Sequence, residues 1–498
     1  MSLFCKSAQT IEKQNFYKEK REFSLAKIHK MLSEKIMSLY KLLYKNLHVI
    51  YLIIAAPFCI ISCFIVPPLL GSDEWAHFAR AVEISAGKIT GEQGKKGENG
   101  GSSVIPDSIL TFMLHPSFSP EYFSSDSKIK IEKSSRVDLR HLEWSKNEVV
   151  TGNPFVAYPP TSYIPASIAL FISRVAGVHI ISSFYVGRFS TAVASLILAA
   201  ITISLLDRGK WFAFLFLSTP AVLYLFGSYA QDAMLICYVA IAIALFDYSH
   251  RNKFSRKKSD IILGICAVFF SAVIAARPPY LPLALLLPIY LIWFKKETRL
   301  GLIAFAIIIA YPLIWALIAA PLVHHNQFPG IDEYAQAKFI LGHPLRFISA
   351  LLNSSIQWRA VFGLAGTTSL PLPSYAYKLY ILVFAALAIN ESFAHQNLRP
   401  VTFRVLSVVA FVGCSVLLMT VSYLCWTPLE SEAAYPLAGR YLLPLTFLFI
   451  FIPGFKTPRI KKSLYWIPLS ISIISIFVIV LVNLNGVLSL MHGYLFIR

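Results

Sequence analysis

The stretch HVIYLIIAAPFCIISCFIVPPLL, at residues 48–70 near the amino terminus, is almost entirely apolar and indicates the class of fold. A membrane-crossing helix needs about 20 consecutive apolar residues, so this run predicts one transmembrane span. The preceding residues 1–47 form a polar tail with ten Lys and Arg against four Glu. A cleaved signal peptide has a short basic region and a short apolar core. We therefore expect an uncleaved first span after a basic cytoplasmic tail, whose residues 36–47 form either an interfacial helix or an extension of the span.

The composition of the whole chain agrees with a membrane protein. Of 498 residues, 56% are apolar and only 14% are charged, whereas soluble domains carry about 25% charged residues. These values exclude a soluble enzyme, a disordered chain and a fibrous protein. The formal net charge of +19 would suggest nucleic-acid binding in a soluble protein. In a membrane protein the position of each charge matters more than the total, because cytoplasmic loops are enriched in Lys and Arg.

Further apolar runs along the chain predict a polytopic fold. They lie at about residues 184–206, 212–227, 231–247, 261–276, 280–294, 300–322, 374–390, 404–425, 441–455 and 463–485. Together with the first run they predict an all-α integral membrane protein of about eleven transmembrane helices, and roughly ten to thirteen are compatible with the pattern. The predicted transmembrane domain covers residues 48–485, and residues 486–498 form a short carboxyl-terminal tail.

Basic connectors determine the predicted orientation of the spans. The segments 250–258, 295–299 and 456–462 are rich in Lys and Arg, which is typical of the cytoplasmic side. The apolar stretch 161–177 is short and flanked by prolines. A crossing there would put these connectors on the side opposite to the basic tail. We therefore assign 161–177 as a re-entrant or interfacial helix.

Two long loops are expected on the extracytoplasmic side, at residues 71–160 and 323–373. The first contains ten Lys and Arg against twelve Asp and Glu, so the net positive charge of the chain lies mostly on the cytoplasmic side. Neither loop contains a cysteine, and no disulfide framework is expected. A shorter turn on the same side contains Tyr229, Gln231 and Asp232.

The segment GSDEWAHFAR at residues 71–80 directly follows the first span. If this segment is helical, Asp73, His77 and Arg80 share one face, because they are four and three positions apart. Charged groups at the edge of a membrane are costly and commonly functional. This face would offer a carboxylate, an imidazole and a guanidinium to a ligand. The structural alternative is a capped helix with an internal chain of ion pairs.

Several arginines are predicted at extracytoplasmic turns, against the usual bias of positive charge toward the cytoplasm. Arg277 precedes Tyr280 in one turn, and Arg440 precedes Tyr441 in another. Arg188 lies near the start of the second span. A guanidinium that binds an anion such as a lipid phosphate would explain these positions. The alternative is that the side chains reach toward lipid headgroups without a specific ligand.

Four segments of the chain carry a family resemblance. They are GSDEWAHFARAVEISAGKI (71–89), YPPTSYIP (158–165), ARPPYLPLALLL (276–287) and CWTPLESEAAYPLAGRYLLPL (425–445). In this order they resemble a bacterial family of polytopic membrane proteins that is labelled as a domain of unknown function and is similar to the GT-C glycosyltransferases. The resemblance covers most of residues 48–455. Trp75 stands where relatives often have proline and Ala438 where they tend to have glutamine, and neither difference removes an ionisable group.

The resemblance implies a GT-C-like glycosyltransferase of the bacterial inner membrane, acting in the assembly or modification of cell-surface polysaccharide. Its donor would be a polyprenyl-phosphate-linked sugar, and its acceptor an extracytoplasmic glycan, lipid or protein. The expected partners are the donor, the acceptor and the lipid bilayer, without nucleic acid. No metal ligand is assigned, although some GT-C enzymes use a divalent ion. Glu430 and Glu432 are either candidates for such an ion or simply solvated.

The resemblance also assigns site residues. Asp73 matches the acidic catalytic position, with Glu74 beside it. The residues that we expect to bind the substrate or the lipid phosphate are His77, Arg80, Arg188, Arg277, Tyr280, Arg440 and Tyr441. A carboxylate can accept the proton of the acceptor hydroxyl, and fixed arginines can neutralise the departing phosphate. A single carboxylate base implies inversion at the anomeric carbon.

Two other classes of membrane protein would also need a cationic site for a lipid phosphate. A transporter or flippase of lipid-linked glycans predicts paired halves with charges at the membrane midplane, and the sequence has no clear internal symmetry. A polymerase or ligase of surface polysaccharide usually has its largest loop later in the chain, whereas here it follows the first span. If the protein were a non-catalytic scaffold, replacement of Asp73 by Asn would have no effect.

Overall fold

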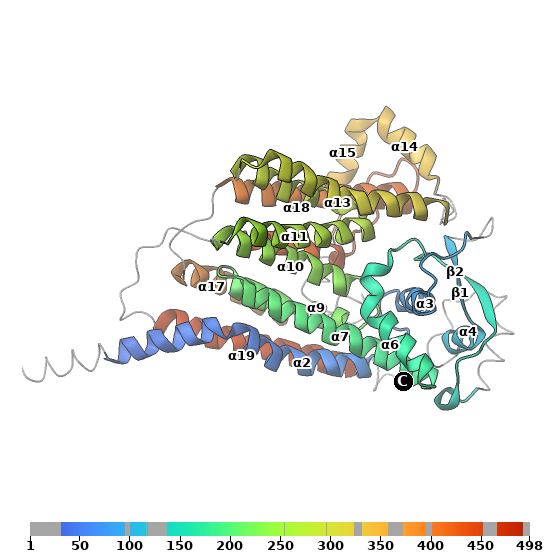
Figure 1. Ribbon diagram of the computed structural model, residues 1–498, viewed down its shortest axis with the longest axis horizontal. Coiled ribbons are helices and arrows are strands. Elements are labelled where there is room, and N and C mark those ends of the chain that lie inside the picture. The colour runs from blue at the N-terminus through green and yellow to red at the C-terminus, as the bar shows by residue number, and fades with distance from the viewer. Residues whose placement is uncertain are drawn as a thin grey trace, which may run out of the picture.

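The computed structural model of the protein describes residues 31–94, 100–115, 117, 137–252, 254–294, 296–322, 331–356, 372–394, 401–451 and 466–491. The predicted connector 456–462 lies outside these residues, as do parts of the predicted tails and of the loop 323–373. The described chain is mostly helical, and its long helices run side by side (Figure 1).

Seven of the described helices are long and apolar enough to cross a membrane. They are α2 (Leu47–Ile65), α7 (Ile180–Leu205), α10 (Asp232–Arg251), α11 (Arg256–Ala276), α13 (Thr298–Ala319), α18 (Val401–Trp426) and α19 (Trp466–Met491). In α10, 83% of the apolar window is buried, against 22% in α13 and 28% in α18. Helix α10 therefore lies at the centre of the bundle, while α13 and α18 leave most of their surface to lipid. The protein is a multi-pass helical membrane protein.

The other four predicted spans take different forms. The run 212–227 contains two short helices, α8 (Lys210–Leu217) and α9 (Pro220–Phe226), because Pro220 lacks the N–H that would continue α8. The Thr219 side chain accepts from the backbone N–H of Val222 and begins α9. The run 374–390 is a single helix, α17 (Ser374–Ala394).

The runs 280–294 and 441–455 contain long stretches of 3₁₀ helix in place of a continuous α-helix. The first begins as the 3₁₀ helix η6 (Pro278–Leu285), followed by one α-turn, α12 (Leu286–Ile289), and the π turn η7 (Tyr290–Phe294). The second contains the 3₁₀ helices η9 (Gly439–Leu442) and η10 (Pro444–Phe451). Runs of 3₁₀ helix longer than three or four residues are uncommon and often mark functional regions. Each run begins at an arginine of the predicted site, Arg277 or Arg440.

The segment that follows α2 covers one end of the bundle. We call this segment the cap, and the end that it covers the capped end. The elements of the cap are α3 (Glu74–Ser85), β1 (Gly101–Pro106), α4 (Asp107–Met113), η4 (Leu139–His141), β2 (Glu148–Asn153), η5 (Pro160–Tyr163) and α6 (Ile164–Val175). The antiparallel pair β1–β2, from Gly101 opposite Asn153 to Pro106 opposite Glu148, is an addition to the predicted all-α fold. An aromatic core joins the cap to the bundle, with Phe78 and Phe112 of the cap and Phe184 of α7 fully buried.

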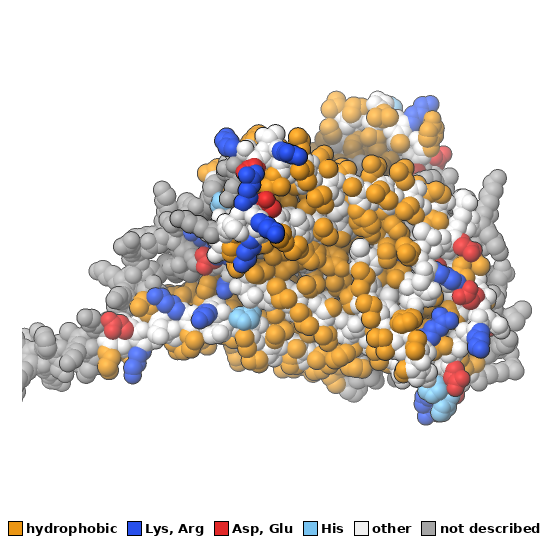
Figure 2. Space-filling model, in the orientation of Figure 1, with side chains coloured by type: hydrophobic (Ala, Val, Ile, Leu, Met, Phe, Trp, Pro, Cys, Tyr) orange, Lys and Arg blue, Asp and Glu red, His pale blue; other side chains and the backbone are white. Residues whose placement is uncertain are grey.

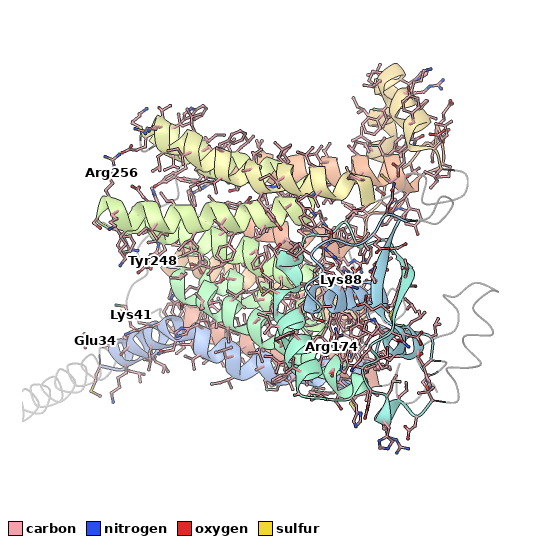
Figure 3. All side chains as sticks on the ribbon, turned by 45° about the vertical axis from the view of Figure 1, so that its right-hand side comes forward. Glu34, Lys41, Lys88, Arg174, Tyr248 and Arg256 are labelled. Atoms are coloured by element: carbon pink, nitrogen blue, oxygen red, sulfur yellow. The ribbon has the colours of Figure 1, made fainter. Side chains whose placement is uncertain are left out.

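Helix α6 corresponds to the predicted re-entrant or interfacial helix 161–177. It is only 12 residues long and packs against α3 and α7 without crossing the bundle. Its Ile168, Phe171 and Val175 side chains are exposed, with 73% exposure at Val175. The basic connectors lie at the opposite end: Arg251 pairs with Asp207, and Figure 3 shows Lys41 and Arg256 far from Lys88 and Arg174 of the cap. Lys41, shortly before α2, and the described basic residues Arg251 and Arg256 thus lie at the end opposite to the cap.

Candidate functional site

Four charged side chains from distant parts of the chain meet at the capped end. Asp73 precedes α3, Asp232 begins α10, Arg277 follows α11 and Arg440 lies in η9. The Arg440 Nη2 atom lies 2.5 Å from Asp73 Oδ2, and Arg277 Nη1 lies 2.9 Å from Asp232 Oδ1. Arg440 Nε is a further 3.9 Å from Asp232 Oδ2. Two carboxylates and two guanidiniums therefore form one electrically balanced cluster, which we call the Asp–Arg cluster.

Asp73 is the accessible member of this cluster. Its backbone has φ 51° and ψ 24°, a left-handed conformation that Asp tolerates better than most residues. The side chain does not cap α3 and instead accepts a hydrogen bond from Arg440. It remains 47% exposed, against 11% for the Arg440 side chain. The turn thus presents the carboxylate to the solvent and to the arginine at once.

Asp232 is the buried member, and we did not assign it to the site from the sequence. Its side chain is only 2% exposed. It is the first residue of α10, where the positive end of the helix dipole favours a carboxylate. Its contacts with Arg277 and Arg440 are ion pairs without aligned hydrogen bonds, so Arg440 Nε is a buried donor without a hydrogen-bond acceptor among the described residues. The cluster therefore keeps hydrogen-bonding capacity for a ligand.

Two tyrosines hold the arginines in place. The Tyr280 hydroxyl accepts from Arg277 Nη1 at 3.1 Å and donates to the backbone carbonyl of Tyr441 at 2.6 Å. The Arg277 guanidinium carbon lies 4.1 Å from the centre of the Tyr441 ring, and that of Arg440 lies 5.2 Å from it. Such cation–π contacts stabilise a guanidinium that has lost part of its water. The structure therefore brings Asp73, Arg277, Tyr280, Arg440 and Tyr441 together.

His77 lies behind the cluster rather than in it. It is 3% exposed, its Nδ1 atom is 2.7 Å from the Tyr163 hydroxyl, and its ring stacks on Tyr158. Burial lowers the pKa of His77 to about 4, against the opposing effect of the Asp73 and Asp232 carboxylates. The imidazole is thus neutral near pH 7. Asp73 lies outside α3 in a left-handed turn and pairs with Arg440, so it does not share a helical face with His77 as predicted.

The remaining predicted residues form two separate buried pairs. Arg188 Nε donates to Glu74 Oε1 at 2.8 Å, and the guanidinium also donates to the carbonyl oxygens of Cys63, Val66 and Pro67. Glu74 further accepts from the backbone N–H groups of Gly71 and Tyr229. Both side chains are at most 1% exposed. This pair ties the end of α2 to α3, α7 and the turn before α10, and it leaves no open face to a ligand.

Arg80 is likewise enclosed in the cap. It pairs with Glu83 at 3.1 Å and donates to the carbonyl oxygens of Tyr158 and Ile89. Glu83 in turn accepts from the N–H of Val104 in β1. Both ionic side chains have 0% exposure. Arg80 therefore joins α3 to the sheet and to the segment before η5.

An apolar pocket of about 210 Å³ borders the Asp–Arg cluster. Arg277 and Tyr441 line it on the cluster side, and Tyr158 separates it from His77. Its other walls come from the end of α11, the start of η6, from α18 and from the segment before η9; they are Ala276, Pro278, Pro279, Leu418, Val421, Ser422, Trp426, Pro436, Leu437 and Ala438. The arrangement suits a ligand with an anionic group and an apolar chain.

Metal ligands are not gathered in the described part of the chain. No group of three or more His, Cys, Asp or Glu side chains there is placed to hold a metal ion. Glu430 and Glu432 are both exposed. Glu430 has a positive φ of 60° and lies in the segment between α18 and η9.

Comparison with known proteins places the chain in a family. The family model described as a predicted membrane protein, DUF2142, matches residues 57–449 and so includes every residue of the Asp–Arg cluster. No curated protein and no solved structure matches the chain. A match over this much of the sequence identifies the family, and the chain belongs to the DUF2142 family of predicted membrane proteins.

Proposed function

We propose that the protein is a GT-C-like glycosyltransferase that moves a sugar from a polyprenyl-phosphate donor to an extracytoplasmic acceptor. The observation that carries the proposal is the Asp–Arg cluster beside an apolar pocket. The two arginines suit a phosphate, the pocket lined by Arg277 suits the first part of a prenyl chain, and Asp73 is an exposed carboxylate that pairs with Arg440. A glycan, lipid or protein with a free hydroxyl would be the acceptor.

In this proposal the donor phosphate binds between Arg277 and Arg440. The Nε atom of Arg440 needs an acceptor, and a phosphate oxygen would supply it. Because Arg440 also pairs with Asp73, a bound phosphate would compete for that guanidinium and release the Asp73 carboxylate. The resting cluster is thus balanced internally, and donor binding would prepare the base.

The reaction then follows from the positions of these groups. The acceptor oxygen forms a bond to the anomeric carbon while its proton passes to Asp73. The bond between the anomeric carbon and the phosphate oxygen breaks, and its electron pair stays on the phosphate. Arg277 and Arg440 neutralise the charge that develops there, in a region with little water. One carboxylate base implies inversion at the anomeric carbon. Glu74 has no part in this scheme, since Arg188 and two backbone N–H groups occupy it.

The proposed topology places the capped end on the extracytoplasmic side of a bacterial inner membrane. The basic connectors at the opposite end support this orientation. The four shorter apolar segments would complete eleven spans. The apolar pocket is lined by Pro278 and Pro279 and supports entry of the prenyl chain beside them, whereas α6 does not line this pocket.

The test compares Asp73→Asn with Asp138→Asn in isolated membranes. Asp138 is a matched control, since its side chain is also 47% exposed and pairs with an arginine of the cap, Arg140. Transfer from a panel of undecaprenyl-phosphate sugars is measured with radiolabelled sugar. We expect Asp73→Asn to lower transfer by about 10²- to 10⁴-fold and the control to leave it unchanged.

Two outcomes would contradict the proposal in different ways. Near wild-type transfer by Asp73→Asn would remove Asp73 from the role of base. Binding of undecaprenyl phosphate without transfer of any sugar would instead favour a transporter, flippase, polymerase or ligase of lipid-linked glycans.

A further inference from the structure

A helical hairpin stands beside the bundle at its capped end. It consists of α14 (Glu333–Gly342) and α15 (Pro344–Asn353). Figure 1 shows that α15 runs across the direction of the long helices and projects beyond α13 and α18. The hairpin is attached to α18, since Gln336 donates to the carbonyl oxygen of Tyr423 and the Phe347 ring lies 5.3 Å from the Tyr423 ring.

The outer side of this hairpin is apolar. Leu345, Ile348 and Leu352 are 80%, 51% and 80% exposed and lie three and four positions apart, on one side of α15. Leu341 at the end of α14 is 83% exposed. We call these four residues the leucine stripe. Large exposed apolar side chains in a contiguous stripe mark an interaction surface rather than an ordinary solvated face.

The partner that fits the stripe is the surface of the lipid bilayer. The hairpin packs against the span α18, whose outer surface is also apolar: Val409 and Val412 are 57% and 51% exposed. Figure 2 shows hydrophobic side chains extending from the bundle onto the hairpin, with charged side chains at its far edge. An amphipathic helix lying parallel to the membrane presents its faces in this way.

The hairpin also holds the segment that leads to Arg440. Backbone N–H groups of that segment donate to the hairpin and to the residues directly after it: Glu430 to Gln336, Ala434 to Ser354 and Leu437 to Ser355. Leu437 lines the apolar pocket and is three residues from Arg440. A displacement of the hairpin would therefore be transmitted to the Asp–Arg cluster through these bonds.

We propose that the hairpin α14–α15 is a lipid-surface anchor. The leucine stripe inserts among the headgroups of the leaflet at the capped end, and the bonded segment 430–437 couples that contact to the position of Arg440. The proposal stands independently of the proposed transferase activity, since it concerns only the membrane contact of the hairpin and its mechanical link to the cluster.

The first experiment measures the contact with lipid. Cysteine is introduced by Leu345→Cys or, on the polar side of the same helix, by Arg346→Cys, and each protein is labelled with a fluorophore in lipid nanodiscs. The unsubstituted protein, labelled in parallel, gives the background from native cysteines. Lipids with a nitroxide near the headgroup should quench the label at 345 at least about twofold more strongly than the label at 346. Equal quenching at the two positions would overturn the proposal.

The second experiment measures the coupling. The double variant Leu345→Asn/Leu352→Asn changes only exposed side chains, and Arg346→Asn, on the polar side of α15, is its control. Amide hydrogen exchange is followed in nanodiscs, with the central helix α10 as an internal measure of folding. We expect several-fold faster exchange at Ala434 and Leu437 in the double variant, with α10 unchanged. Unchanged exchange at these two amides would exclude the coupling.

Discussion

Two neighbouring carboxylates at the start of α3, Asp73 and Glu74, have opposite surroundings. Glu74 is fully buried, and Arg188 and the N–H of Tyr229 are among its partners. Asp73 is 47% exposed and shares one arginine, Arg440, which retains an unused donor. The buried pair of Glu74 and Arg188 therefore joins helices inside the protein. The pair of Asp73 and Arg440, one residue earlier in the chain, is partly exposed and keeps a free donor. The difference separates a buried pair whose partners are complete from a partly exposed pair that retains a donor for a candidate ligand.

The largest expected effect comes from breaking the buried pair. Arg188→Leu leaves Glu74 in the interior without its partner, which should lower the free energy of unfolding by about 3–5 kcal/mol. The double variant Glu74→Gln/Arg188→Leu should recover part of this loss because no buried charge remains. Unfolding in detergent measures both, and Arg440→Leu is the comparison. Equal destabilisation by Arg188→Leu and Arg440→Leu would contradict the distinction between the buried Glu74–Arg188 pair and the partly exposed Asp73–Arg440 pair.

The next largest effect concerns the partly exposed pair of Asp73 and Arg440. Arg440→Leu should weaken binding of undecaprenyl phosphate by about 10- to 100-fold, because hydrogen bonds to charged groups contribute about 1.5–3 kcal/mol each. Affinity is measured for the purified protein in nanodiscs. Arg140→Leu, which removes an exposed arginine of the cap, should leave it unchanged. Undiminished affinity in Arg440→Leu would show that the cluster does not hold the phosphate.

His77 is a third case, because it is buried like Glu74 but lies near Asp73. Its pKa is about 4 in the folded protein, below the ordinary value of 6.5, so the unfolded chain binds more protons between these values. Its contribution to stability is complete above pH 6.5 and is lost as the pH falls toward 4. From pH 7 to pH 5 we expect a loss of about 2 kcal/mol, which His77→Gln should lack. Unfolding midpoints across this range provide the measurement, and identical pH dependence in both proteins would refute the assignment.

The smallest effect is expected at Tyr280. Tyr280→Phe removes the hydroxyl that joins Arg277 to the Tyr441 carbonyl, at a cost of about 1 kcal/mol. Affinity for undecaprenyl phosphate should therefore fall by roughly fivefold. The control is Tyr375→Phe, which removes an exposed hydroxyl that donates to Asn485. A similar change in both variants would mean that the Tyr280 hydroxyl does not position Arg277.

Part of the site could be predicted from the sequence. Arg277 and Arg440 stand out because they break the usual charge bias of membrane loops, and Asp73 stands out because it follows a span. The structure brings these three residues together although Asp73 and Arg440 are 367 positions apart. Asp232 was harder to recognise, because an acidic residue at the start of an apolar helix is also expected for favourable interaction with the helix dipole.

Other features could not be read from the sequence. Glu74 and Asp73 differ by one position, and only the left-handed turn at Asp73 sends their side chains to different surroundings. The spans were predicted from apolar content, which is the same for α-helical and 3₁₀ winding. Hydropathy therefore located the runs 280–294 and 441–455 without revealing how they are wound.

The winding after Arg277 has a mechanical consequence. A 3₁₀ helix rises about 2.0 Å per residue and an α-helix about 1.5 Å. The eight residues of η6 therefore span about 16 Å, and rewinding them as an α-helix would shorten the segment by about 4 Å. With η6 fixed at its far end, that shortening exceeds the 2.9 Å that separates Arg277 from Asp232. A change of winding within this segment would thus shorten it by more than the contact distance between the two charged groups, and so could move Arg277 relative to Asp232.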